Sequence, residues 1–282
     1  MSYNNFKPVV LSAKIQRELE KDCTLVMGCN REFEGEATQG GRVKIPNLGR
    51  PTIKDYHSNT PIDDAEVVPD GSVYLDIDQA SYFNFQVEDI DKALSKGNLM
   101  DALIAEAKSG IAEKQDAFVG SLALKAPARM TISSVGIATP DAAMEQLKKA
   151  LLMLRNNHVK SSMKIYADVP WWFYELIVDK TLDLDTDNSE VLAGGVLRRV
   201  RDIYLRPTTM LHQVTASSVT DDLIMVRTKK AIAFAAAIDK LEPYRPEKAF
   251  ADAVKGVAAY GGKIVRPEQM VVIKAHKSTQ SA

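Results

Sequence analysis

Residues 73–122 read VYLDIDQASYFNFQVEDIDKALSKGNLMDALIAEAKSGIAEKQDAFVGSL, and the apolar period changes within this stretch. In its first part apolar and polar residues alternate, which is typical of half-buried β-strands. From Glu88 onward the period is 3.6, and Ile90, Ile104 and Phe118 lie on one helical stripe. An unbroken helix of about 34 residues would measure about 50 Å, about the diameter of a compact globule of this chain length. The stretch therefore predicts two strands and then a long spine helix in an extended subunit.

Alternating helix and strand signals follow this spine helix. Thr139-Pro-Asp supplies an N-cap, a first-turn proline and an acidic residue, so we expect a helix from there to about Asn157. Its expected inward-facing stripe consists of Met144, Leu147, Leu151 and Leu154. Residues 164–168 predict a strand, and residues 170–178 predict a helix. This middle region has the α/β alternation of a discrete subdomain.

The C-terminal part is rich in β-compatible runs. We expect long strands there, interrupted by Pro243, Pro246 and Pro267. The runs lie at residues 223–227, 231–242 and 255–275.

The N-terminal segment has too few apolar residues to anchor a core. Within residues 7–22, Leu11, Ile15 and Leu19 form a stripe only one residue wide. This pattern predicts a short helix that either docks on the body of the subunit or reaches onto another subunit.

Residues 35–72 predict a β-hairpin with little to bury. Residues 42–46 form the first expected strand, residues 52–57 form the return strand, and only Val43 and Ile45 face one side of the first. Because an isolated two-stranded hairpin is marginal in water, something else must cover it. The hairpin either packs on its own domain or lies over a neighbouring molecule.

Composition excludes several classes of protein. Among the 282 residues, 36 Lys and Arg oppose 37 Asp and Glu, so the formal charge of −1 leaves no basic excess for coating nucleic acid. The longest apolar run, residues 231–238, is far shorter than the roughly 18 residues that a membrane span needs. The N-terminus lacks the apolar core of a secretory signal, which predicts synthesis in the cytoplasm without export.

The chain carries no common catalytic or cofactor motif. Its two cysteines, Cys23 and Cys29, are not in a CxxC pair, and its four histidines lack zinc-ligand spacing, so we expect two reduced, inert thiols. The motifs GxGxxG, GxxxxGK[ST] and GxSxG are absent. These observations predict no catalytic residue, no metal site and no cofactor.

Three local clusters could suggest a binding site. Asp183, Asp185 and Asp187 are spaced like the first ligands of a calcium loop, but Asn188 stands at the glycine position and Gly194 at the glutamate position. We therefore interpret these aspartates as a solvated acidic loop, and a metal-dependent soluble enzyme is the alternative.

The other two clusters are basic and aromatic. The arginines between residues 198 and 206 resemble a nucleic-acid patch, but we interpret them as a solvated face that pairs with the acidic loop. The four aromatic residues 171–174 point all round the start of a predicted helix, and we interpret them as packing residues rather than a ligand cage. The basic residues are Arg198, Arg199, Arg201 and Arg206.

The amino-acid sequences of several segments, and their order along the chain, resemble those of the major capsid proteins of tailed bacteriophages, which share the Hong Kong 97 capsid fold. The resemblance covers nearly the whole chain and depends on the number and order of the phrases, because none of them is a chemical motif. The phrases are Leu11-Ser-Ala-Lys, Asn30-Arg-Glu-Phe-Glu-Gly-Glu, Gly41-Arg-Val-Lys-Ile-Pro, Ile53-Lys-Asp-Tyr, Leu75-Asp-Ile-Asp-Gln-Ala-Ser-Tyr-Phe-Asn-Phe-Gln-Val-Glu-Asp-Ile-Asp, Phe250-Ala-Asp-Ala-Val-Lys-Gly and Tyr260-Gly-Gly-Lys-Ile-Val-Arg-Pro-Glu.

The resemblance implies an α+β phage major capsid fold with five segments. Residues 1–34 correspond to an N-terminal arm, and residues 35–72 to an extended loop, a β-hairpin that lies on the adjacent subunit. Residues 73–127 correspond to a peripheral domain with the spine helix, residues 128–221 to an axial domain, and residues 222–282 to return strands of the peripheral domain.

The resemblance also implies a function and partners. Such proteins form pentamers and hexamers of an icosahedral shell that encloses double-stranded DNA without sequence-specific binding. Some relatives begin with a scaffolding domain that is removed, whereas here the arm-like segment begins within a dozen residues of Met1. We therefore expect a separate scaffolding protein and a portal, with a decoration protein left open, and location in the virion after assembly in the host cytoplasm.

An encapsulin-like bacterial compartment, which shares the fold but encloses a cargo enzyme, is the alternative function. The candidate contact residues lie on the arm and on the extended loop. They are Leu11, Ile15, Leu19, Arg42, Lys44, Arg50, Lys54 and Tyr56.

Overall fold

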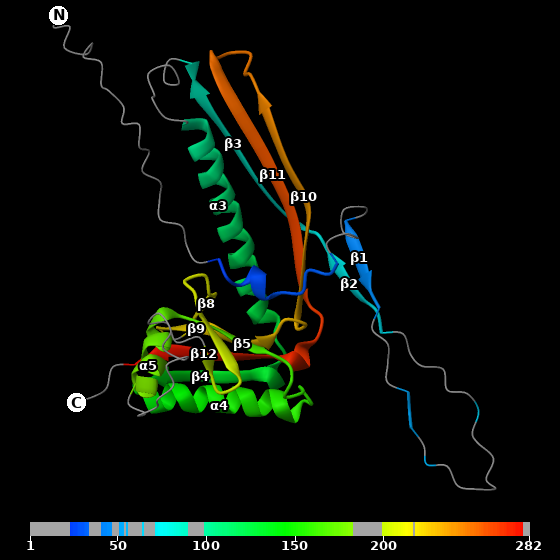
Figure 1. Cartoon of the computed structure of the whole chain (residues 1–282), viewed down its shortest axis with the longest axis vertical. Coiled ribbons are helices and arrows are strands. Elements are labelled where there is room, and N and C mark those ends of the chain that lie inside the picture. Colours follow the sequence, from blue (N-terminus) through cyan, green and yellow to red (C-terminus); the bar gives the residue numbers. More distant parts are fainter. Residues whose placement is uncertain are drawn as a thin grey trace, which may run out of the picture.

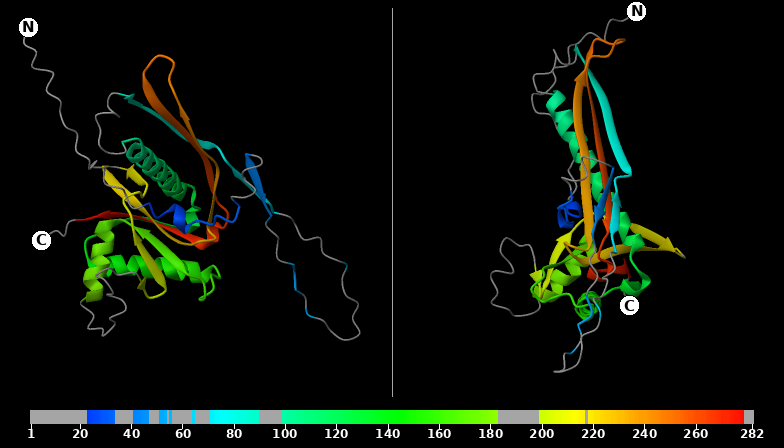
Figure 2. Two further views of the ribbon diagram at one scale, coloured as in Figure 1. Left: turned by 45° about the horizontal axis from the view of Figure 1, so that its top comes forward. Right: turned by 90° about the vertical axis from the view of Figure 1, so that its right-hand side faces the viewer.

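The computed structural model combines two unequal lobes and a short ribbon (Figure 1). It describes residues 23–33, 41–46, 51–53, 55, 64, 71–89, 99–182, 199–216 and 218–278. Within these ranges the strands form sheets of seven, three and two strands. The views in Figure 2 show the three-stranded sheet extending away from the body that holds the seven-stranded sheet. This mixed architecture confirms the predicted α+β class.

The seven-stranded sheet and two helices form the body. The strand order is β4-β12-β9-β5-β7-β6, with β8 paired to β9. Apolar side chains of α4 and α5 pack against this sheet and form the largest of the core clusters among the described residues. The elements are β4 (Thr131–Ile137), α4 (Pro140–Asn156), β5 (Ile165–Val169), α5 (Trp171–Leu182), β6 (Arg199–Val200), β7 (Ile203–Pro207), β8 (Gln213–Ala216), β9 (Val219–Thr228) and β12 (Met270–Lys277).

Helix α4 confirms the predicted cap and stripe. The Thr139 hydroxyl accepts a hydrogen bond from the amide of Ala142 at 3.3 Å, and the helix continues to Asn156. Leu147 and Leu154 are buried against the sheet. The strand and the helix expected after α4 are likewise present as β5 and α5.

The second lobe consists of a long three-stranded sheet and helix α3. The sheet has the order β10-β11-β3, and the Phe118 ring of α3 packs edge-on against Tyr260 of β11 with 5.6 Å between centroids. The elements are β3 (Gln79–Glu88), α3 (Leu99–Ser121), β10 (Ile232–Tyr244) and β11 (Ala251–Ile264).

Two boundaries in this lobe differ from the prediction. Strand β3 continues through Glu88, because that residue still pairs with Ala251 of β11, and the chain becomes helical at Asp89, one residue later than predicted. The described helix begins at Leu99, spans 23 residues and measures about 35 Å, while residues 90–98 lie outside the described part. Pro243 does not interrupt β10, because β10 is an edge strand and its outer side needs no amide donor.

The partner of the strand at residues 42–46 also differs from the prediction. Strand β1 (Arg42–Ile45) pairs antiparallel with β2 (Val73–Asp76), and residues 51–53 and 55 are not in a strand. Val43 lies opposite Leu75, and both are buried in a small core cluster, whereas the expected return strand offered less apolar surface. The two ends of the 46–72 segment are therefore held together by the β1–β2 ribbon.

Strand pairing also divides the C-terminal range 222–282 between both lobes. β10 and β11 join β3, but β9 and β12 join β4 and β5 in the body. The assignment of this whole range to the peripheral domain therefore does not follow the observed pairing. Short 3-10 turns complete the described part: η1 (Val26–Gly28), η2 (Leu122–Lys125), η3 (Ala128–Met130) and η5 (Pro267–Gln269).

Candidate inter-subunit surfaces and the node that supports them

A buried ionic node lies between the two lobes. Asp168 of β5 and Arg227 of β9 have fully buried side chains, and Nε of Arg227 lies 3.0 Å from Oδ2 of Asp168. Arg206 of β7 lies 2.5 Å from Oδ1 of Asp168 and stacks over the Tyr166 ring at 4.7 Å. One carboxylate thus forms ion pairs with two guanidinium groups, the buried Arg227 and the partly exposed Arg206.

This node fastens residues 25–30, which we name the N-terminal clasp. Arg227 donates hydrogen bonds to the carbonyl oxygens of Gly28 at 2.7 Å and Leu25 at 2.8 Å. The Asp116 carboxylate of α3 accepts the amides of Leu25 and Val26, both at 2.9 Å. The clasp therefore connects the body with α3. This connection fixes the position at which the preceding chain joins the subunit.

The clasp also pairs with β10. The amide of Asn30 donates to the carbonyl of Ile232 at 2.8 Å, and the amide of Phe234 donates to the carbonyl of Asn30 at 2.9 Å. Strand β9, helix α3 and strand β10 therefore hold the six residues of the clasp. Because these elements come from both lobes, the clasp has a fixed position relative to both lobes.

Burial shifts the pKa of several groups around the clasp. Burial raises the pKa of the Cys29 thiol against the opposing effect of Arg227, so the thiol stays protonated. Burial also raises the pKa of Asp116, although the amides of Val26 and Leu25 act in the opposite direction. Burial is the largest single effect and lowers the pKa of Arg227, but the interactions with Asp168 and Cys29 together outweigh it, so the net direction of the pKa shift is upward.

The node was not predicted from the sequence, and its structure corrects the prediction that Arg206 is solvated. Arg206 does not belong to a solvated face, because its side chain is only 16% exposed and it pairs with Asp168. Arg199 is exposed as predicted and lies 3.6 Å from Asp202, whereas Arg198 is outside the described part. The available signal was a single charged residue in each of two apolar runs, Asp168 in IYADV and Arg227 in LIMVRT.

Two of the eight candidate contact residues lie in the described part. Arg42 and Lys44 are exposed on β1. Arg42 pairs with Asp76 of β2 and lies over the Tyr74 ring at 5.3 Å, and the hydrogen bond to Asp76 raises the pKa of Arg42. The other six, Leu11, Ile15, Leu19, Arg50, Lys54 and Tyr56, lie outside the described residues.

Large apolar side chains are exposed on several elements. Phe250 at the β10–β11 turn is 87% exposed, Tyr82 of β3 is 82% exposed and Met27 of the clasp is 70% exposed. Helix α3 adds Leu103 and Ile111, which are only half-buried. Exposed apolar side chains of this size on several elements favour a partner that covers them.

Several chemical sites are not found among the described residues. No group of three or more His, Cys, Asp or Glu side chains in that part could hold a metal ion. The aspartates 183, 185 and 187 lie outside it. In the same part, no helix has the length and apolar character needed to cross a membrane. Of the aromatic run, Phe173 and Tyr174 are buried, and Trp172 donates to Asp222 at 2.7 Å, which confirms packing for these three.

No protein-family model and no curated protein sequence matches the chain. Solved structures do match it. The structure from Mycobacterium phage Che8 has a TM-score of 0.77 and 24% identity, and the match covers 96% of this chain and 98% of that one. The capsid structure of cyanophage P-SCSP1u has a TM-score of 0.75 and 16% identity, with coverage of 95% and 92%.

The capsid of Ralstonia phage GP4 has a TM-score of 0.70 and 11% identity, and the match covers 100% of this chain and 99% of that chain. These identities are low, but each match spans nearly all of both chains. The chain therefore has the Hong Kong 97 fold of phage capsid subunits, as its sequence predicted.

Proposed function

We propose that this chain is the major capsid protein of a tailed bacteriophage, which assembles into the pentamers and hexamers of an icosahedral shell around double-stranded DNA. The observation that carries the proposal is the fold similarity to phage capsid structures over 95% or more of this chain, with no large unmatched segment left for another activity. A shell protein requires surfaces rather than a reactive centre, so we assign the chain no catalytic residue.

Three features of the described residues support self-assembly. The clasp fixes where the N-terminal segment leaves the body, and the β1–β2 ribbon fixes where residues 46–72 leave it. The exposed Phe250, Tyr82 and Met27 provide apolar surface that a partner would cover. In this proposal residues 1–34 are the arm, and residues 35–72 are the loop that lies on the adjacent subunit.

The two lobes then have separate roles. The body, with α4 and α5, takes the axial position near the five-fold and six-fold axes, and α3 with the β10-β11-β3 sheet takes the peripheral position. A separate scaffolding protein and a portal complete assembly, and the product is part of the virion.

Negative-stain microscopy tests the function directly. We expect closed shells when the chain is expressed with the scaffolding protein of its own genome, because its exposed apolar surface needs neighbouring copies. A strictly monomeric product under these conditions would overturn the proposal.

A loop deletion tests which segment joins the subunits. Ile45 lies opposite Val73, so a Gly-Ser turn that replaces residues 47–71 should close the β1–β2 ribbon without disturbing either lobe. We expect a soluble, cooperatively unfolding subunit that no longer closes shells. Normal shells from this variant would exclude the loop from the subunit contact.

A further inference from the structure

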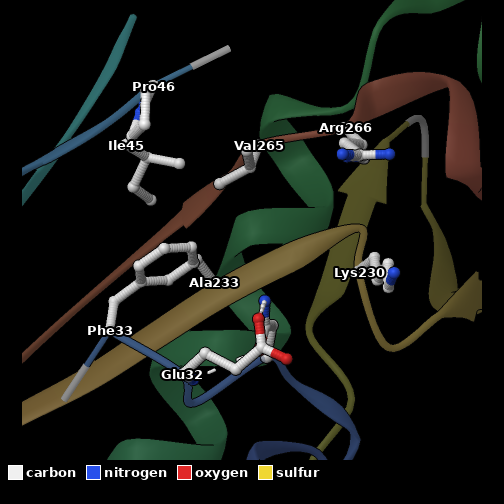
Figure 3. Close-up of a pocket in the computed structure, with 9 residues that line it drawn as sticks. Glu32, Phe33, Ile45, Pro46, Lys230, Ala233, Val265 and Arg266 are labelled. Carbon is white, nitrogen blue, oxygen red and sulfur yellow. Dashed lines mark hydrogen bonds between the residues drawn. The ribbon is translucent and has the colours of Figure 1, made fainter. Parts of the chain in front are cut away.

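A pocket of about 200 Å³ lies where β1, the clasp and the turns next to β10 and β11 meet. Figure 3 shows Phe33, Ile45 and Val265 on one side of the hollow, and Lys230 and Arg266 on the other. The pocket therefore combines an apolar wall with a cationic wall.

The apolar wall is the open side of a small core cluster. Ile45 and Ala233 are buried members of this cluster, and Phe33 and Val265 are partly buried against it. Pro46 extends the same wall and is exposed. An apolar side chain from a partner would complete the cluster.

The cationic wall has fixed backbone positions and no charge partner. The amides of Val265 and Arg266 both donate to the carbonyl of Ala231, at 2.9 and 3.2 Å, which holds the two turns together. Within the described ranges, the side chains of Lys230 and Arg266 make no hydrogen bond or ion pair. The carboxylate on the pocket rim, Glu32, instead accepts from the Asn30 side chain at 3.1 Å.

Nearby cations differ from these two. Lys263 donates to the carbonyl of Tyr74 at 2.9 Å, and Arg129 lies 3.0 Å from Glu268. The pocket is therefore a local positive site on a chain with a formal charge of −1, and it fits a surface with an apolar side chain next to carboxylates.

One face of α5 has this chemistry. Trp171, Glu175 and Asp179 follow each other at spacing four, so they share a face, and all three are exposed, Trp171 at 44%. Among the described residues the side chains of Glu175 and Asp179 have no hydrogen bond or ion pair, whereas Lys180 on the same helix pairs with Asp141 at 2.9 Å. We name Trp171, Glu175 and Asp179 the acidic face of α5.

Helix α5 and the pocket lie on opposite sides of the subunit. Figure 1 places α5 at one end of the body, and the pocket residue Ile45 belongs to β1, which stands on the other side. A contact between two different patches is heterologous, and repetition of such a contact around an axis closes a ring.

We propose that the acidic face of α5 of one copy docks on the Phe33–Lys230–Arg266 pocket of the next copy in the ring. Trp171 contacts the apolar wall, and Glu175 and Asp179 pair with Lys230 and Arg266. This inference deepens the proposed function, because it assigns residues to the contact between neighbouring subunits of a pentamer or hexamer.

Zero-length cross-linking with a carbodiimide tests the contact in assembled shells. The reagent joins an amine to a carboxylate only when the two are in ion-pair contact. Shells assembled from a mixture of ¹⁵N-labelled and unlabelled copies should give peptides in which Lys230 of one copy is linked to Glu175 or Asp179 of another. Shells that form normally but lack this link would overturn the docking proposal and leave the proposed function intact.

Charge reversal tests whether the contact drives assembly. The variants Lys230→Glu/Arg266→Glu and Glu175→Lys/Asp179→Lys should each raise the concentration needed for assembly by roughly tenfold or more, because like charges then face each other. The four-fold variant reverses both sides and should restore assembly. Lys148→Glu on the exposed surface of α4 is the matched control, for which we expect wild-type assembly.

The remaining outcomes separate this inference from other interpretations. Loss of assembly in both reversal variants without rescue in the combined variant would contradict a direct pairing. Cross-links from Lys230 only to a scaffolding protein would assign the pocket to that partner instead. Failure of the wild-type chain to form any oligomer would overturn the proposed function itself.

Discussion

Arg227→Met removes the cation at the centre of the ionic node while keeping much of its volume. The variant loses three charge-assisted hydrogen bonds, to Asp168, Gly28 and Leu25. Such bonds contribute about 1.5–3 kcal/mol each. Because Arg206 remains as a counter-ion for Asp168, we take the lower end for each bond and expect a loss of about 4.5 kcal/mol in the free energy of unfolding.

Urea denaturation of the unassembled subunit measures this loss, which corresponds to a fall of about 10 °C in the melting temperature. Hydrogen exchange at the amides of Leu25 and Val26 should accelerate as well, since the clasp loses one of its anchors. The control is Arg199→Met, which removes an exposed arginine and should cost less than about 1 kcal/mol. A loss below about 1 kcal/mol for Arg227→Met would refute the role of the node.

Further substitutions test other parts of the fold. The folded-state pKa of Asp116 lies above its ordinary value of 3.8, so its contribution to stability is fully present below pH 3.8 and is lost as the pH rises through the folded-state pKa. Asp116→Asn should remove this component from the pH dependence of the free energy of unfolding, and an unchanged pH profile would contradict the burial effect. Thr139→Ala should cost about 1 kcal/mol through loss of the α4 N-cap, measured by urea denaturation, and a neutral effect would exclude a capping role. Gly261→Ala should cost about 2 kcal/mol or more, because the new methyl group would clash with the carbonyl oxygen of Asp76. Gly110→Ala has open space around the new methyl group and should stabilise α3 by about 0.5–1 kcal/mol. A higher melting temperature for Gly261→Ala than for Gly110→Ala would contradict the surroundings assigned to these two glycines.

Local signals were sufficient for α4, β5 and α5 of the body, whereas β4, β6, β7 and β8 were not predicted. The cap at Thr139, the apolar stripe of α4 and the strand that follows were all predicted within about two residues of their observed bounds. These features depend on residues close together in the chain, so a single sequence contains the information.

Strand partners were predicted less well. Residues 42–46 formed a strand as expected, but β1 pairs with β2 instead of the expected return strand at residues 52–57, because Val43 and Leu75 bury each other in the same cluster. The periodicity of a strand indicates which face is apolar, but it does not say which other strand covers that face.

Charged residues show the same limit at the candidate surfaces. Arg206 belongs to a basic run in the sequence, yet it is mostly buried against Asp168. Lys230 is an ordinary surface lysine in the sequence, and only the fold places it in the same pocket as Phe33. The aromatic start of α5 predicted packing, which holds for Phe173, but exposure of Trp171 became known only from the structure.

The sequence by itself determined the fold class, the order of most elements and the absence of common enzyme motifs, because these follow from local period, caps and composition. Only the tertiary structure decided how the lobes share the C-terminal strands and which charges are buried. The physical reason is the distance along the chain: Arg227 bonds to Leu25 across 202 positions, and no local pattern encodes such a contact. Likewise, only the fold places the acidic face of α5 and the Phe33–Lys230–Arg266 pocket on opposite sides of one subunit, where they can meet between neighbouring copies.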